Sequence, residues 1–191
     1  MAGAQKFVPK QIVFAGTTAA QSELLAASGL KPGDGLTQAD IQAAAQKLLD
    51  TGAFSDIRFA FDGVQLTYTL KPAAMQPVSY LNFPWWDGDS LNAALAAKVP
   101  LFHGTVAPES PMQQAIADTL QTLLAQKGIA DAKVTAVPVV DQTSGTVQGV
   151  QYHIDSPAVQ VGSVTFSGAN PAWNPTLAAI AKAAAGQNFD P

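Results

Sequence analysis

The side chains that could do acid, base or metal chemistry are few and scattered. The chain has two histidines, His103 and His153, and no cysteine, which excludes thiolate catalysis, thiolate metal sites and disulfides together. Neither histidine lies in a metal-ligand spacing such as HExxH. We expect both to be surface residues, with His153 on the solvent face of a strand because it alternates with Tyr152 and Ile154.

The carboxylates form no acid and base pair in sequence. Glu23 and Glu109 are the only glutamates, and neither has a second carboxylate close by. Serine elbows of the form GxSxG and phosphate loops are absent, and the GDG cluster at 33–35 lacks the preceding strand of a dinucleotide site. We therefore expect no enzyme, with no catalytic residue, no metal and no cofactor. Aspartates distant in sequence are the one remaining route to a catalytic pair.

Two adjacent tryptophans, Trp85 and Trp86, have two interpretations. Beside Asp87 and Asp89 they could stack on sugar rings or anchor a partner. The alternative is structural, in which they fill the seam between two units or cover the base of the second one. We favour the structural role and keep glycan binding as a hypothesis.

Composition is typical of a folded protein that binds no nucleic acid. Hydrophobic residues make up 48% of the 191 residues and charged residues 13%, which suits one or two domains with a core. The net charge of −4 supplies no basic field for nucleic acid or an anionic membrane. We expect no membrane span in this segment and find no signal-peptide pattern in its first ten residues.

The elements that must position these residues are laid down twice. A strand ending at Gly16, a helix over about 19–28, a helix capped by Thr37 and Asp40, and a hairpin turning at the Asp-Gly of 62–63 make the first set. The second set has a strand over 78–83, a helix from Asp89 or Ser90, a helix from Ser110 and Pro111, and strands over 133–140 and 149–154.

A third set begins at residue 161 and is incomplete. The segment VGSVTFSGAN repeats QIVFAGTT, with Phe166 and Gly168 in the places of Phe14 and Gly16, and a helix is expected from about 175 to 185. One strand and one helix cannot bury a core, so we expect this part either to pack against the second unit or to be a fragment of a longer protein.

The repeated plan resembles the POTRA (polypeptide-transport-associated) family. The resemblance rests on a strand that ends in an aromatic and a Gly or Asn, and on the helix ends TGAFSDI and KGIADAKV that precede each hairpin; the aromatic and Gly or Asn pairs are Phe14 with Gly16, Tyr80 with Asn82, and Phe166 with Gly168. It implies an α+β fold of tandem β-α-α-β-β units, each a three-stranded mixed sheet covered on one face by two helices. The units would span 7–74, 75–157 and 158–191. The second unit departs from the pattern in NFPWWDGD and in a longer, more apolar loop over 100–108.

Pro138 indicates which edge of the second sheet is open. Because proline cannot donate to a strand ladder, the strand KVTAVPVV must lie at an edge or be bulged. The implied order is first strand, third strand, second strand, with the hairpin's first strand outermost. Such an edge can accept an extended segment of another chain by β-augmentation. The residues that we predict for partner binding are Ile57, Arg58, Phe59, Ala60, Phe61, Val134, Thr135, Ala136, Val137, Trp85 and Trp86.

The resemblance implies a periplasmic, outer-membrane-associated module that docks or chaperones unfolded outer-membrane or exported polypeptides. Its partners would be extended or unfolded polypeptide segments and an outer-membrane barrel in the same or another chain. A cell-envelope scaffold that binds folded partners, as in POTRA-bearing septum proteins, is the alternative from another class. Alternating strands after residue 191 would favour the first, and an upstream apolar helix the second.

Overall fold

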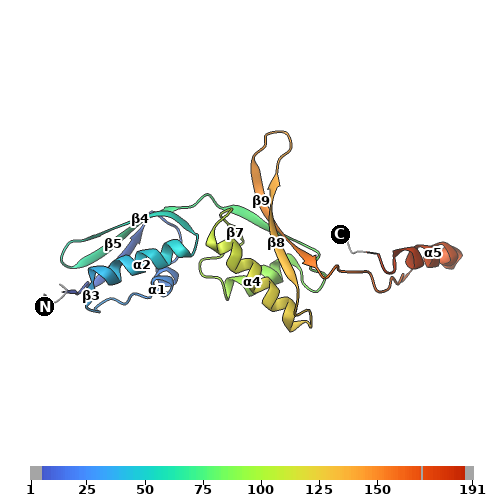
Figure 1. The fold of residues 1–191 in the computed structure, drawn as a ribbon, viewed down its shortest axis with the longest axis horizontal. Coiled ribbons are helices and arrows are strands. Elements are labelled where there is room, and N and C mark those ends of the chain that lie inside the picture. Colours follow the sequence, from blue (N-terminus) through green and yellow to red (C-terminus); the bar gives the residue numbers. More distant parts are fainter. Residues whose placement is uncertain (1–5, 169, 188–191) are drawn as a thin grey trace.

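The computed structural model describes residues 6–168 and 170–187 and has an α+β fold. Two units of strands and helices lie side by side, and a third segment with one longer helix extends away from the second unit (Figure 1). The first two units have the predicted element order of strand, helix, helix, strand, strand. The α+β fold built from such units is therefore confirmed.

The first unit holds a three-stranded mixed sheet. In it β2 runs parallel to β5 and β4 runs antiparallel to β5, so that the strand order is β2-β5-β4. The short strands β1 and β3 form a separate antiparallel pair. The elements of this unit are β1 (Lys6–Phe7), β2 (Gln11–Ala15), α1 (Gln21–Ser28), β3 (Leu36–Thr37), α2 (Gln38–Asp50), β4 (Phe54–Phe61) and β5 (Gln65–Pro72).

Helix α2 forms where the sequence predicts it. The Thr37 hydroxyl accepts from the Asp40 N–H while the Asp40 carboxylate accepts from the Thr37 N–H at 2.8 Å, a reciprocal capping box. Of the predicted apolar stripe, Ile41, Ala44, Ala45 and Leu48 are buried and Leu49 is partly buried. These side chains pack on the inner face of the sheet, formed by Leu66, Tyr68 and Leu70.

The second unit repeats this plan with one addition. Its sheet has the order β7-β6-β9-β8, in which β6 is parallel to β9 and β8 is antiparallel to β9. The predicted three strands are present, and the long loop over 100–108 supplies β7 as a fourth. The elements are β6 (Gln76–Leu81), α3 (Gly88–Ala96), β7 (Thr105–Val106), α4 (Pro111–Gln126), β8 (Lys133–Val140) and β9 (Val147–Ser156).

Helix α4 starts at the predicted Pro111, but the cap differs from the expectation. The Ser110 side chain makes no capping hydrogen bond and its hydroxyl donates to the Ala107 carbonyl at 2.6 Å. Gln113 instead accepts from the Glu109 N–H at 2.7 Å. The hydroxyl is already committed to the preceding turn, so the first turn of α4 uses the amide.

The two units touch through the end of α2 and the loop before α4. Gly52 is buried with φ of 76°, and a Cβ on it would lie 2.9 Å from Ser110 Cβ and 3.0 Å from the Met112 nitrogen. Leu101 and Ala53 pack against both cores. A glycine at position 52 therefore both ends α2 and allows the second unit to approach.

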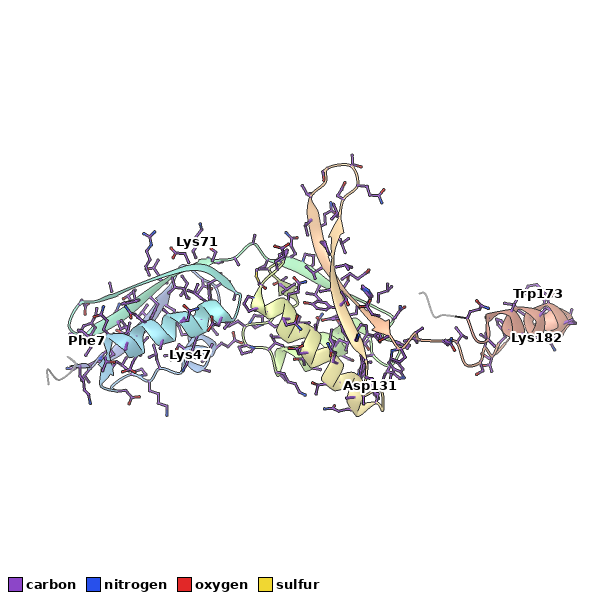
Figure 2. The ribbon with its side chains drawn as sticks, viewed as in Figure 1. Phe7, Lys47, Lys71, Asp131, Trp173 and Lys182 are labelled. Carbon is purple, nitrogen blue, oxygen red and sulfur yellow. The ribbon has the colours of Figure 1, made fainter. Side chains whose placement is uncertain are left out.

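The third segment contains η1 (Pro171–Trp173) and α5 (Asn174–Ala184). The predicted helix is present, whereas residues 161–167 form no strand. A strand needs a continuous neighbour for its backbone groups. Among the described residues only Val161 of this segment has one: its N–H donates to the Gln187 carbonyl at 2.9 Å and its carbonyl accepts from the Gly186 N–H at 2.7 Å. The final residues of the predicted third unit, 188–191, and residue 169 lie outside the described part of the chain. Side chains of α5, including Lys182, spread outward around the helix, as does Trp173 beside it (Figure 2).

Candidate functional site

In the two larger sheets, four strands flank the central strands, and they differ in what covers their far edges. The central strands β5 and β9 are paired on both sides. Strands β2 and β6 lie on one flank of their central strand, and β4 and β8 lie on the other. An outer strand offers N–H and C=O groups to another chain only where nothing else in the protein binds them.

The outer edge of β2 is occupied at Phe14 by one side chain. The Gln21 carboxamide accepts from the Phe14 N–H at 3.0 Å and donates to the Phe14 carbonyl at 2.8 Å. In a parallel pair the N–H and C=O of one residue point the same way. The amide of Gln21 thus takes the two bonds that an incoming strand would make at Phe14.

The outer edge of β6 is covered by a strand. β7 pairs antiparallel with β6 through Gln76 with Val106 and Pro77 with Thr105. Beyond that pair the Val78 N–H donates to the Gly104 carbonyl at 3.1 Å. The loop that distinguishes the second unit therefore protects its first strand. Neither Gln21 nor β7 was identified from sequence, because a lone glutamine and a two-residue strand leave no periodic signal.

Strand β4 presents its outer edge along its length. The Asp62 N–H donates to the Gln65 carbonyl at 3.2 Å and closes the hairpin. Because antiparallel pairs alternate between bonded and non-bonded positions, Phe61, Phe59 and Ile57 direct their backbone groups away from β5. The same three side chains lie on the inner face opposite Leu66, Tyr68 and Leu70, with Phe59 38% exposed at the border.

The remaining predicted residues of β4, Arg58 and Ala60, are exposed on the face away from the helices. Arg58 Nε lies 3.3 Å from Asp56 Oδ2 on that face. Backbone groups of these residues point toward β5 by the same alternation, since Arg58 pairs with Thr69 and Ala60 with Thr67. Arg58 and Ala60 therefore lie next to the open edge, but their backbone N–H groups are not available to a partner strand.

Strand β8 is an outer strand, as Pro138 predicts. Pro138 lies opposite Val150, and its nitrogen, which has no hydrogen, is compatible with a position that points away from β9. Ala136 and Val134 share this parity, so their N–H and C=O groups also point outward. Between them Thr135 and Val137 point their backbone groups toward β9.

The side chains along β8 change from buried to exposed. Val134 is buried, Ala136 and Val137 are partly buried, and Thr135 is exposed. The end of the β8–β9 hairpin projects beyond the rest of the second unit (Figure 1), and Val139 and Val140 there are 40% and 44% exposed. The predicted residues of both strands therefore lie at two separate edges, one in each unit.

Trp85 and Trp86 lie apart from these strand edges, near the start of α3. Their rings meet edge to face at 6.0 Å between centroids. Trp86 packs partly against the second core, with Lys127 Nζ 5.4 Å from its ring centroid, and Trp85 is 40% exposed. Trp86 thus covers the base of the second unit. The Trp85 side chain keeps a solvent-exposed surface, and glycan binding there stays a prediction.

The two histidines pair with carboxylates on the surface. His103 Nε2 lies 3.2 Å from Glu23 Oε2, which joins the two units, and His153 Nε2 lies 2.6 Å from Asp155 Oδ1. Thr135 donates to Asp155 across the strands, and this bond, with His153 as a further cause, holds the pKa of Asp155 below its usual range. Within residues 6–168 and 170–187, no three metal-binding side chains gather.

A cleft of about 840 Å³ lies between the two units. Its wall includes Phe54 and Met75, with Leu101 and the His103 and Glu23 pair. The cleft was not predicted, because it forms only when the long loop of the second unit meets the first.

No helix among the described residues is long and apolar enough to cross a bilayer.

A comparison with known protein families gives a match within the first unit. A family model for POTRA, described as a surface antigen variable number repeat, matches residues 8–73. No curated protein matches the chain.

Three solved structures are similar over most of the chain. The N-terminal domain of Omp85 from Thermosynechococcus elongatus is 17% identical, with 97% of this chain and 80% of that one covered and a TM-score of 0.41. POTRA1-2 of Omp85 from Anabaena is 17% identical, with 81% of this chain and 98% of that one covered and a TM-score of 0.37. POTRA3-5 of BamA from Haemophilus influenzae is 16% identical over 98% and 82%, with a TM-score of 0.31. The first unit, over residues 8–73, is therefore the part of the chain that matches the POTRA family model.

Proposed function

We propose that this chain is a protein-interaction module that binds extended polypeptide segments by adding them as strands to β4 and β8. The observation that carries the proposal is the selective closure of edges. Gln21 binds both outward backbone groups of Phe14 in β2, and β7 covers the first residues of β6, while no described group covers the outward backbone groups of β4 and β8. A protein that needed only to avoid aggregation would close all four.

The predicted binding strength is low. Outward groups at Ile57, Phe59 and Phe61, or at Val134 and Ala136, give a few backbone hydrogen bonds at a net ~1 kcal/mol each. Association costs several kcal/mol, which leaves Kd values of about micromolar to millimolar. Binding through backbone groups tolerates many sequences. Weak, tolerant binding suits the transfer of unfolded clients and does not suit catalysis.

The POTRA domain in residues 8–73 supports a periplasmic location and a role in outer-membrane protein assembly or polypeptide transport. The clients would then be unfolded outer-membrane or exported polypeptides. Units spanning 7–74 and 75–157 would each supply one edge. A scaffold that binds folded partners remains the alternative, and it would require a contact surface larger than one strand edge.

An NMR titration tests the proposal. The probe is an unstructured peptide of about ten residues that alternates apolar and polar side chains and ends in an aromatic, as outer-membrane strands do. We expect amide shifts at 57–61 and 134–140. The matched control is the same peptide N-methylated at alternate residues, which keeps its side chains and loses donors. Equal binding of both peptides, or no shift at either edge, would contradict strand addition.

Ala136→Pro separates binding from stability. Because the Ala136 N–H points outward, the substitution removes a donor to the client and no bond to β9, so we expect weaker peptide binding with little change in unfolding free energy. Val137→Pro is the control, since its N–H points to β9, and the loss of that ladder hydrogen bond should destabilise the second unit by about 1–3 kcal/mol. Loss of stability in Ala136→Pro, with peptide binding unchanged, would argue against an open edge at β8.

A further inference from the structure

The ends of β2 and β6 and the end of the segment 161–167 share one local geometry. Gly16, Asn82 and Gly168 have φ of 83°, 66° and 73°, and each follows an aromatic residue by two positions. These aromatics are Phe14, Tyr80 and Phe166. The left-handed residue turns the chain from the strand toward the helix that follows.

In the first two units the aromatic has a matched partner. Phe14 stacks on Tyr68 of β5 with centroids 5.4 Å apart, and Tyr80 stacks on Tyr152 of β9 at 6.3 Å. Each pair sits in register across parallel strands. The partner residues Tyr68 and Tyr152 have no exposed surface.

The partner tyrosine also reaches the second helix of its unit. The Tyr68 hydroxyl donates to the Ile41 carbonyl of α2 at 3.0 Å, and the Tyr152 hydroxyl donates to the Gln113 carbonyl of α4 at 3.1 Å. One residue of the central strand therefore joins the first strand to the second helix in each unit. This arrangement is a repeated interface with a defined chemistry.

The third segment presents the first half of that interface, and no described residue of the first two units packs against it as part of a core. Phe166 is 46% exposed, and α5 has no buried residue. A Cβ on Gly16 would lie 2.3 Å from the Leu70 carbonyl oxygen of β5, whereas a Cβ on Gly168 would meet no atom within 4 Å. We call this the Phe166 face, an open pocket of about 450 Å³ whose lining includes Val164, Phe166, Leu177, Ala178 and Ala181.

Packing against the second unit does not cover the Phe166 face. Val159 contacts the second core, and among the described residues after it none belongs to either core. Trp173 and Ile180 add further exposed apolar surface, at 63% and 51%. A face of this kind usually marks an interaction site.

We propose that the Phe166 face binds a polypeptide made of an amphipathic helix followed by a β-hairpin, whose second strand runs parallel to residues 161–167 and places a tyrosine against Phe166. The order of elements identifies this occupant, because residues 161–167 and α5 correspond to β2 with α1 and to β6 with α3. The elements that complete both other units are a helix and a hairpin. The inference is independent of the open edges at β4 and β8.

An extended chain tests the proposal. A copy of residues 36–73, which contains α2, β4 and β5, is appended after residue 191, and a second version carries a copy of residues 107–157. We expect hydrogen exchange of amides 162–167 to slow by at least about tenfold in one version or both. Unchanged exchange in both versions would overturn the proposal.

Variants within the extension define the tyrosine contact. Tyr68→Ser in the appended copy should return amides 162–167 to their original exchange rates while the first unit keeps its own protection. Gly168→Ala gives a second readout: it should leave exchange in the original chain unchanged and lower protection in the extended chain, where a backbone carbonyl would approach. Full protection in the Tyr68→Ser version would overturn the assigned tyrosine contact.

Discussion

At the scale of single residues, the tyrosines connect layers of the fold. The chain has three tyrosines, and burial raises the pKa of Tyr68, Tyr80 and Tyr152 alike. Tyr80 donates to Asn92 Oδ1 at 2.7 Å, and the other two donate to helix carbonyls. The pKa of each phenol therefore lies above its ordinary value while the units remain folded.

This burial predicts an alkaline transition. A group whose pKa is raised on folding stabilises the protein fully below its unfolded pKa of 10.0, and that stabilisation is lost as the pH rises through the folded value. We expect phenolate absorbance to stay low through pH 10 and to rise together with the loss of secondary structure. The measurement is a spectrophotometric titration followed in parallel by circular dichroism. Ionisation of one tyrosine near pH 10, with the fold intact, would contradict the burial.

Gly16 is a second position where one atom matters. Gly16→Ala should destabilise the first unit, because the new Cβ would lie 2.3 Å from the Leu70 carbonyl oxygen and φ is 83°. Gly63→Ala is the control, since φ there is 101° and nothing lies within 4 Å. The left-handed backbone alone costs about 1–2 kcal/mol, so Gly16→Ala should cost at least about 1 kcal/mol more than Gly63→Ala in urea unfolding. Equal losses would contradict the close approach.

At the scale of elements, the start of α2 depends on the capping box. Thr37→Ala should lower the unfolding free energy of the first unit by about 1 kcal/mol. Thr122→Ala is the control, because Thr122 is exposed within α4 and its hydroxyl bonds only the Asp118 carbonyl one turn back. Alanine there should leave stability equal or slightly higher.

The capping box also makes stability depend on acid. Hydrogen bonds from the Thr37 backbone and side chain hold the pKa of Asp40 below 3.8. The stabilisation from this lowered pKa is present above 3.8 and is lost as the pH falls through the folded value. The stability gap between the protein and Asp40→Asn should therefore narrow on acidification, and a gap that is constant with pH would contradict it.

The elements were largely predictable because they carry periodic or turn signals. The apolar stripe of α2, the Asp-Gly turn and Pro138 each indicated a local structure that the fold confirms. Strand β7 and the Gln21 carboxamide were not predictable, because each depends on a partner brought near by tertiary packing. Residues 161–167 resemble β2 in sequence but have no neighbouring strand, so similarity alone did not make them a strand.

The candidate site was predictable in part for the same reason. An edge position follows from a proline that cannot donate, which located β8. The direction of each backbone group along β4 required the register to Tyr68, which only the structure supplies. Trp86 illustrates the remaining gap, since the cation of Lys127 over its ring comes from the far end of α4.

At the scale of the whole molecule, Leu101 joins the two units. It packs against both cores and has φ of 62°. Leu101→Ala should keep the backbone strain and remove the apolar contact, so that the units reorient relative to one another. We expect separate NMR alignment tensors for the two units in this variant.

Glu23→Gln provides the control for Leu101→Ala. Its contact with His103 also spans the units, but the Glu23 and His103 side chains are largely exposed, at 43% and 59%, and even a charged pair at such a position contributes at most about 1 kcal/mol. The two tensors should stay alike in Glu23→Gln. Tensors that separate in Glu23→Gln and not in Leu101→Ala would show that charge, and not apolar packing, sets the arrangement.

The clasp of Gln21 on Phe14 has a consequence for self-association. With this contact, the first sheet has one open strand edge, at β4. Without it, the same sheet would have open edges at both β4 and β2, which face opposite ways. Sheets with two open edges can pair end to end without limit, whereas sheets with one open edge can form only dimers. The Gln21 carboxamide thus limits edge-to-edge pairing of the first sheet to its β4 side.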